Sequence, residues 1–393
     1  MAGRVLAGTF TRLVVSLMAT IAAGGIAASC SGSNGTSQGS SGASSKGSSA
    51  DGWGAGAMPP GLPGISAVAC PSKTHCVGTV SAGSIVFTMN GGASWSTGTL
   101  PSGWSTNGGL GGISCATTRD CVAFGSDVGA MISTVVLFTR NGGVSWSIGQ
   151  SQPGSFGIAS CPSATYCIAV GNNGSGSTSA EASTDGGARW TLIPVATAAG
   201  SARVSCPSIK VCISFGIDGS VYTTDGTHWF YGAVPALGAA GGNLFVGGLS
   251  CSSNRNCVAV GSEGFPTPTP GQPKDTDFAV FTANGGRNWS LGSIPSTLTG
   301  SALDTPELTG VSCSSTKDCV AIGGGQGSPG LALVSRNGGA AWSMGNMPPK
   351  VPQMFGISCP STSDCVAVGG ANTGITATAY YTTDGGRSWV KGH

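Results

Sequence analysis

Short apolar runs recur through residues 58–393, each bounded by glycine, proline or small polar residues. The last repeat shows the pattern clearly, with runs at 355–359, 365–369 and 377–383 and a final segment around Trp389. Runs of this length, closed by turn residues, are typical of β-strands. The run 365–369 is apolar at every position, which predicts a strand that is covered on both faces. We therefore expect four antiparallel strands, A to D, in each repeat.

The cysteines report the period of the repeat. The first cysteine of each C-x5-C pair recurs every 45 or 46 residues, except for one interval of 62 between Cys251 and Cys313. A period in the forties with strand-like content is typical of β-propeller blades. The predicted fold class is all-β, a seven-bladed β-propeller over residues 58–393 whose blades need no borrowed strand. Met58-Pro-Pro resembles the link before the last blade, so this stretch is expected to pack across the seam of the ring.

The cysteine pairs predict one disulfide per blade. There are 15 Cys, and one of them, Cys30, belongs to the N-terminal segment considered below. The other 14 form an even set in one spacing, which implies disulfides if the protein is exported. The pairs are Cys70/Cys76, Cys115/Cys121, Cys161/Cys167, Cys206/Cys212, Cys251/Cys257, Cys313/Cys319 and Cys359/Cys365. Zinc knuckles favour a shorter spacing, and the histidines do not recur with the pairs, so we expect neither a metal nor a cofactor. Each bridge closes a short loop and is expected to stabilise the folded protein by about 2.4 kcal/mol.

A second motif recurs between the cysteine pairs, reading Ser/Thr-x-Asn/Asp-Gly-Gly-x-x-Trp, with the fourth copy one residue short. Its turn residue and tryptophan are Asn90 and Trp95, Asn141 and Trp146, Asp185 and Trp190, Asp225 and Trp229, Asn284 and Trp289, Asn337 and Trp342, and Asp384 and Trp389. The motif resembles the Asp-box, or BNR, repeat. Asn or Asp followed by Gly suits a tight turn, and a returning Trp can fill space between sheets. Because both Asn and Asp occur at this position, a structural role is favoured over acid chemistry.

The N-terminus resembles a bacterial lipoprotein signal. Arg4 and Arg12 precede an apolar stretch that ends in Ala-Ala-Ser-Cys at Cys30. The expected organisation is a signal peptide over 1–29, a lipidated Cys30 with a Ser/Gly-rich tether over 30–57, and the propeller over 58–393. An ordinary signal peptide or an uncleaved anchor is the alternative. The protein is thus expected on the outer face of the cytoplasmic membrane or at the cell surface, tethered with a reach of about 30 Å.

Charge is sparse and the two ends of the propeller differ in it. Charged residues make up 8% and the net charge is +2, which argues against a generally basic nucleic-acid binder. The mean hydropathy of +0.20 is high and suggests strands that are buried on both faces. The A–B and C–D turns fall at one end of every blade, and ten basic against six acidic residues are expected there. The B–C loops and D–A links fall at the other end, the top, where eight acidic residues face three basic ones. The alternative is that these are turn-forming polar residues without a shared purpose.

The longest top loops, in blades five and six, are the expected contact surface, since variable loops on a rigid scaffold often bind. Five carboxylates are expected to converge there with Phe265 nearby, while the link between blades four and five adds Tyr231 and the link between blades one and two adds Trp104. The candidate ligand-binding residues are Glu263, Phe265, Asp275, Asp277, Asp304, Glu307, Tyr231 and Trp104. Such a surface favours a cationic, metal-bridged or polyhydroxylated ligand.

The expected function is a non-catalytic cell-envelope scaffold that acts as a monomer and binds a protein or glycan. The chain is similar to seven-bladed BNR proteins such as the photosystem II assembly factor, a family that works by protein contact. The alternative is a sialidase-like or other glycoside hydrolase. Sialidases grip a substrate carboxylate with an arginine triad, whereas Arg203 is the one arginine expected on the top face. Under this alternative Asp304 and Glu307 would be the acid–base pair, and no catalytic residue is assigned.

Overall fold

The computed structural model describes residues 58–392, with gaps at 103, 105–108, 128–132, 151–153, 174–177, 194–202, 218, 238–242, 265–275, 299–306, 326–328 and 371–376. The predicted signal peptide, the lipidated Cys30 and the tether lie outside the described residues. No helix among the described residues is long and apolar enough to cross a membrane.

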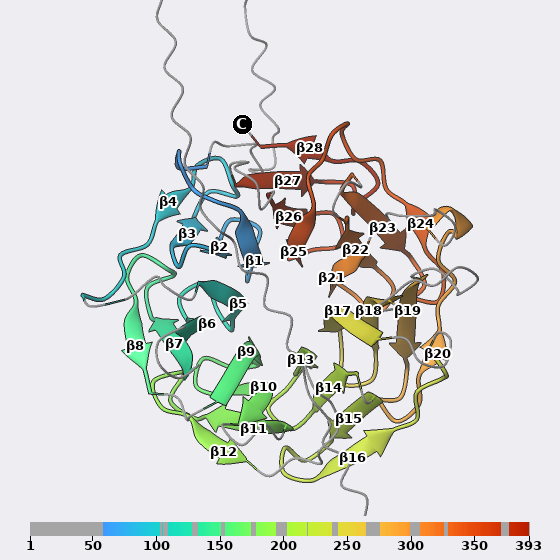
Figure 1. The fold of residues 1–393 in the computed structure, drawn as a ribbon, viewed down its shortest axis with the longest axis horizontal. Coiled ribbons are helices and arrows are strands. Elements are labelled where there is room, and N and C mark those ends of the chain that lie inside the picture. Colours follow the sequence, from blue (N-terminus) through green and yellow to red (C-terminus); the bar gives the residue numbers. More distant parts are fainter. Residues whose placement is uncertain are drawn as a thin grey trace, which may run out of the picture. The chain divides into compact units, whose positions relative to one another are not determined.

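Seven four-stranded antiparallel sheets, the blades, form a ring (Figure 1). In every blade the strands follow the order of the chain, from strand A nearest the centre to strand D at the rim. The A strands are β1 (Ile65–Ala69), β5 (Leu110–Cys115), β9 (Gly154–Ser160), β13 (Arg203–Ser205), β17 (Asn243–Cys251), β21 (Leu308–Cys313) and β25 (Met354–Ser358). The B strands are β2 (Cys76–Val80), β6 (Cys121–Asp127), β10 (Cys167–Asn173), β14 (Cys212–Gly216), β18 (Cys257–Gly264), β22 (Cys319–Gly323) and β26 (Cys365–Gly369).

The outer half of each blade completes the sheet. The C strands are β3 (Ile85–Thr88), β7 (Ser133–Thr139), β11 (Thr178–Ser183), β15 (Gly219–Thr223), β19 (Thr276–Thr282), β23 (Leu331–Ser335) and β27 (Thr378–Thr382). The D strands are β4 (Ser96–Thr97), β8 (Ser147–Gly149), β12 (Thr191–Ile193), β16 (Trp229–Gly232), β20 (Ser290–Leu291), β24 (Ser343–Met344) and β28 (Val390–Lys391). A 3-10 turn, η1 (Ser296–Leu298), follows blade five. The prediction of seven contiguous four-stranded blades is confirmed.

Each A–B turn is closed by the predicted disulfide, which is thus confirmed in all seven blades with Cα atoms 4.0–4.1 Å apart. A feature that we did not predict accompanies it. Two residues after the first cysteine stands Ser or Thr, whose hydroxyl accepts a hydrogen bond from the N–H three residues on, as in Ser361 with Asp364 at 3.0 Å. The same bond forms in the other six turns. A hydroxyl that bonds its own turn favours the turn over a continued strand.

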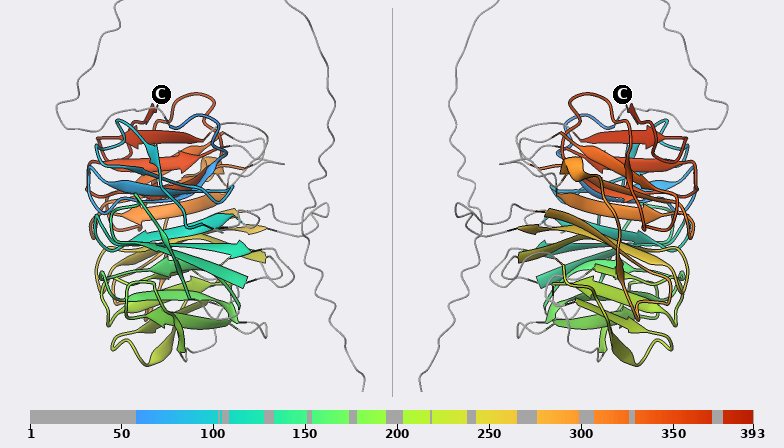
Figure 2. Two further views of the ribbon diagram at one scale, coloured as in Figure 1. Left: turned by 90° about the vertical axis from the view of Figure 1, so that its left-hand side faces the viewer. Right: turned by 90° about the vertical axis from the view of Figure 1, so that its right-hand side faces the viewer.

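The C–D hairpins lie on the same face of the ring as the disulfides, as predicted. In blade seven the Gly385 N–H donates to the Ser363 carbonyl of the A–B turn at 2.7 Å, and the corresponding bond forms in blades one, two, three, five and six. Figure 2 shows the strands running between the two faces, with the turns gathered at either side. We call the face that carries the A–B turns and C–D hairpins the disulfide face, and the opposite one the top face.

The predicted tryptophans fill the junctions between blades. Trp95, Trp146, Trp190, Trp289, Trp342 and Trp389 are buried, and each belongs to a core cluster shared with the preceding blade. The second glycine of the hairpin makes this packing possible. A Cβ on Gly187, which has a φ of +97°, would lie 2.7 Å from Val122 of the preceding blade. The hairpin is therefore a contact between blades as well as a turn.

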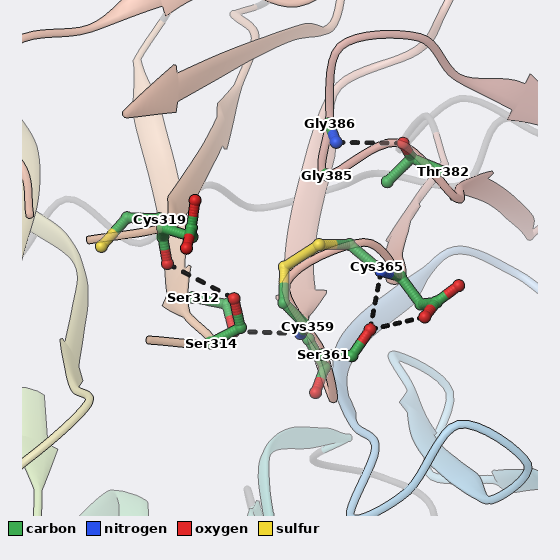
Figure 3. Close-up of a disulfide and its surroundings, with 12 residues drawn as sticks. Ser312, Ser314, Cys319, Cys359, Ser361, Cys365, Thr382, Gly385 and Gly386 are labelled. Carbon is green, nitrogen blue, oxygen red and sulfur yellow. Dashed lines mark hydrogen bonds between the residues drawn. A yellow bond between two sulfur atoms is a disulfide. The ribbon is translucent and has the colours of Figure 1, made fainter. Parts of the chain in front are cut away.

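Serines connect the A strands around the ring. The residue before the first cysteine is Ser in six blades, and its hydroxyl accepts a hydrogen bond from the backbone N–H of the first cysteine of the next blade, at 2.9–3.1 Å. Figure 3 shows this bond between Ser312 and Cys359. Blade one has Ala69 at this position, so its junction with blade two lacks the bond.

The seam between blades seven and one is closed by side chains and backbone without a shared strand. Cys70 N–H donates to Ser358 Oγ at 2.9 Å, and Trp95 Nε1 donates to the Tyr381 hydroxyl at 2.8 Å. Lys73 Nζ lies 2.7 Å from Asp364 Oδ2. Met58 packs against the core shared by the two blades, as predicted for this stretch.

The serines between the A strands predict opposite effects for two substitutions. Ser312→Ala removes one junction bond and should lower the free energy of unfolding by about 1 kcal/mol. Ala69→Ser adds the missing bond and should raise it by a similar amount. Chemical denaturation of both variants tests this, and a loss of stability in Ala69→Ser would contradict it.

Candidate functional site

The top-face carboxylates do not gather as predicted. Glu263 and Asp277 are both buried, 5% and 6% exposed, within the sheet of blade five. The register pairs Glu263 with Thr276 and Asp277 with Ser262. Successive residues of a strand point to opposite faces, so the two carboxylates are directed to different neighbouring blades. The prediction that they converge on one surface is wrong for this pair, because strand alternation separates them.

Asp277 connects two blades. Its Oδ1 accepts a hydrogen bond from the Leu308 N–H of blade six at 3.1 Å. Thr134 occupies the equivalent position in blade two, and its hydroxyl accepts a hydrogen bond from the Phe156 N–H of blade three at 2.7 Å. A position that holds Thr in one blade and Asp in another, with the same kind of bond, is a structural position.

The other predicted residues are scattered. Phe265, Asp275 and Asp304 lie outside the described residues. Glu307 is exposed directly before β21. Trp104 is half-buried at the top face, where its Nε1 donates to the Gly83 carbonyl at 3.1 Å.

Tyr231 is 63% exposed but belongs to strand β16 at the rim, not to a top loop. Of the eight candidates, Glu307 is thus the one that the described structure places exposed on the top face.

The acidic half of the predicted charge separation is also reduced by burial. Glu181, expected at the top, is fully buried in β11. With Glu263 and Asp277, three of the eight expected top-face carboxylates are inside blades. The described part of the top face therefore gives less support to a cation-binding surface than the sequence did.

All six aspartates of the disulfide face hold turns together. Asp185, Asp225 and Asp384 accept backbone N–H bonds within their C–D hairpins, at 2.9, 2.8 and 3.0 Å. Asp120, Asp318 and Asp364 accept from a Thr or Ser hydroxyl of their A–B turns. Burial alone would raise the pKa of Asp364, but hydrogen bonds from Lys73 and Ser361 bring it below its ordinary value.

Three cations of this face pair with those aspartates. Arg140 meets Asp120 at 3.4 Å, Arg336 meets Asp318 at 3.1 Å and Lys73 meets Asp364. Arg140 and Arg336 also donate to backbone carbonyls of the next blade. The remaining seven basic residues of the face are exposed and form no ion pair with a described residue. They are Arg119, Arg189, Lys210, Arg255, Arg287, Lys317 and Arg387. The disulfide face is therefore basic, as predicted.

Blade four departs most from the repeat. Its shortened hairpin has Asp225 paired with His228 at 2.7 Å, and Trp229 is only half-buried. Its D strand, β16, has four residues where the others have two or three. Of the twelve large apolar side chains that are exposed among the described residues, four belong to this blade, namely Ile209, Ile217, Phe230 and Tyr231.

An aromatic and basic cluster lies at the junction of blades four and five. The rings of Tyr222 and Phe230 are 5.8 Å apart, and the guanidinium of Arg287 lies 6.0 Å from the Tyr222 centroid. Lys210 and Arg255 stand in the A–B turns of the same two blades. We call Lys210, Tyr222, Phe230, Arg255 and Arg287 the blade-four patch. The missing residue of the fourth hairpin was the sequence signal that could have pointed to it.

The fold is similar to that of solved propellers. No protein-family model matches the chain, and no curated protein does. Among solved structures, YCF48 from Cyanidioschyzon merolae matches with a TM-score of 0.53 and 14% identity, over 83% of this chain and 97% of that one. U3-55K matches with a TM-score of 0.57 and 11% identity, over 83% and 97% of the two chains. A GH74 enzyme of Niastella koreensis matches with a TM-score of 0.48 and 15% identity, over 84% and 65%. At these identities the likeness concerns the fold alone: the chain is a seven-bladed, all-β propeller with one disulfide in every blade.

Proposed function

We propose that the protein is a non-catalytic binding scaffold of the cell envelope, anchored by a lipid on Cys30, whose partner is an acidic protein. The observation that carries the proposal is the set of seven exposed cations on the disulfide face that form no ion pair with a described residue. The aspartates of that face are engaged in its turns, so its positive charge is available to a partner. The C–D hairpins support membership of the Asp-box group of propellers.

The blade-four patch is the proposed centre of the contact. Interfaces are enriched in aromatic side chains and arginine at their core, and the patch offers both. Its cations favour carboxylates on the partner, and the half-exposed Phe230 offers apolar area that water solvates poorly. Departures from a repeat at one blade are expected where function, not folding, selects the residues.

Cross-linking in the native envelope, followed by binding of the identified partner to purified protein, tests the proposal. The triple change Lys210→Gln, Arg255→Gln and Arg287→Gln should weaken binding at least tenfold, and added salt should weaken wild-type binding. The matched control is Lys350→Gln, which removes an exposed cation from the D–A link on the opposite face and should leave affinity unchanged.

Three outcomes would overturn the proposal. Equal affinity of the triple variant and wild type would remove the disulfide face from the contact. Charge-dependent binding to vesicles rich in phosphatidylglycerol, without a captured protein, would make the partner a lipid. Turnover of envelope glycans by the purified protein would favour the glycoside hydrolase alternative.

A further inference from the structure

Arg203 is the one charged side chain in the described A strands, which otherwise consist of apolar, small and polar uncharged residues. It begins β13, the shortest A strand, in blade four. Charged side chains are rarely found among such residues unless they pair with an opposite charge or bind a ligand. The position of Arg203 therefore needs an explanation.

The position itself is crowded in the other blades. Arg203 stands three residues before the first cysteine, where the other six blades have Ala67, Gly112, Ile158, Gly248, Gly310 and Gly356. A Cβ on Gly112 would lie 2.4 Å from the Gly157 carbonyl oxygen of blade three, and one on Gly356 would lie 2.9 Å from Ala67 of blade one. The position thus faces the A strand of the next blade, where glycine fits best. An arginine replaces it at the junction of blades four and five.

The guanidinium is held in place at this junction. Arg203 pairs with Phe215, whose side chain belongs to the core shared by blades four and five, so Arg203 is on the sheet face directed at blade five. Its Nε donates to the Gly247 carbonyl of blade five at 2.9 Å. This bond fixes the plane of the guanidinium and leaves the two Nη groups with no hydrogen-bond acceptor among the described residues.

The electrostatics of the site favour an anion. Burial lowers the pKa of Arg203 to about 10, and no described carboxylate counteracts that shift. A guanidinium has five N–H donors, and here one of them has a protein acceptor within the described structure. The side chain remains partly accessible, so a small ligand can reach it.

We propose that Arg203 binds a small oxyanion, a carboxylate or a phosphate, between the A strands of blades four and five. A guanidinium whose orientation is fixed presents parallel donors that match two oxygens of such a group. Bound there, the anion would neutralise the one charge of the described A strands. This site shares no residue with the blade-four patch, so its test is independent of the proposed function.

Thermal unfolding of purified protein tests the site, with sodium acetate or inorganic phosphate titrated at an ionic strength kept constant with sodium chloride. The Tm of the wild type should rise with at least one of the two anions, because a ligand of the folded state stabilises it. The apparent affinity of Arg203→Gln for that anion should be at least tenfold lower. Lys350→Gln, which removes an exposed cation outside both proposed sites, should respond like the wild type.

A response to acetate alone assigns a carboxylate, and a response to phosphate alone assigns a phosphate. No rise of the wild-type Tm with either anion would overturn the proposal, as would equal responses of wild type and Arg203→Gln. Arg203→Lys is the control for a folding defect in Arg203→Gln. It keeps the charge without the paired donors, and should fold and bind with an affinity below that of the wild type. Full wild-type affinity in Arg203→Lys would contradict paired recognition.

Discussion

Replacing Trp190 by alanine should lower the free energy of unfolding by about 3–5 kcal/mol, the range for a buried aromatic side chain that leaves a cavity. Trp190 is 2% exposed between blades two and three. Its ring stands edge-on to Phe124 with centroids 5.1 Å apart, and its Nε1 donates to the Gly187 carbonyl at 3.0 Å. The substitution therefore removes packing, a ring contact and a buried hydrogen bond together. The midpoint of guanidinium denaturation measures the loss.

Trp229 provides the matched control for Trp190. It occupies the same position in blade four, but the shortened hairpin leaves it half-buried, and no acceptor for its Nε1 is found in the described structure. Trp229→Ala should cost less than half as much as Trp190→Ala. If both substitutions lowered the free energy of unfolding equally, the depth of burial of the tryptophan would not determine how much it stabilises the blade junction.

Replacing Gly92 by alanine should destabilise the protein by about 2–4 kcal/mol, from a strained backbone and from overpacking. Gly92 has a φ of +83°, a conformation that disfavours any side chain. A Cβ there would lie 2.5 Å from the Tyr381 ring of blade seven. The hydroxyl of Tyr381 accepts the hydrogen bond of Trp95, so the substitution disturbs the seam of the ring. Denaturation together with near-ultraviolet circular dichroism, which senses Trp95 and Tyr381, is the measurement.

Gly111→Ala is the control for Gly92→Ala. Gly111 lies in β5 without a positive φ, and nothing lies within 4 Å of the Cβ that alanine would add. Because alanine restricts the unfolded chain, this variant should be as stable as the wild type or slightly more so. If both variants were destabilised alike, loss of glycine as such, and not the contact with Tyr381, would be the cause.

The blades could be predicted from the sequence because their determinants are local. The C-x5-C turn and the Trp hairpin each fall within eight residues, and both recur in every blade. Strand order then followed from the repeat period. The hydroxyl that bonds each A–B turn is also local, and the Ser or Thr two residues after each first cysteine was a signal that could have been used.

The candidate site could not be predicted equally well, because it depends on contacts between blades. The loops were assigned to faces correctly, but the ends of the strands were not. Glu263 and Asp277 were expected in a loop, whereas Glu263 is the second-last residue of β18 and Asp277 is the second residue of β19. Tyr231 follows Trp229 as Ile148 follows Trp146, so comparing the repeats would have placed it on a D strand. Arg203 was assigned by topology alone, which does not reveal its contact with Gly247.

The continuity of the blades has a consequence for biogenesis. Every sheet is one uninterrupted stretch of chain, and every disulfide joins cysteines with a sequence separation of 6. A blade can therefore pair its own strands and oxidise its own turn without a residue from another blade, and the nearest cysteine is always the correct partner. Contacts such as Trp95 with Tyr381 are the ones that must wait for both the first and the last blade. Assembly would then proceed vectorially, and closure of the circle would be its final event.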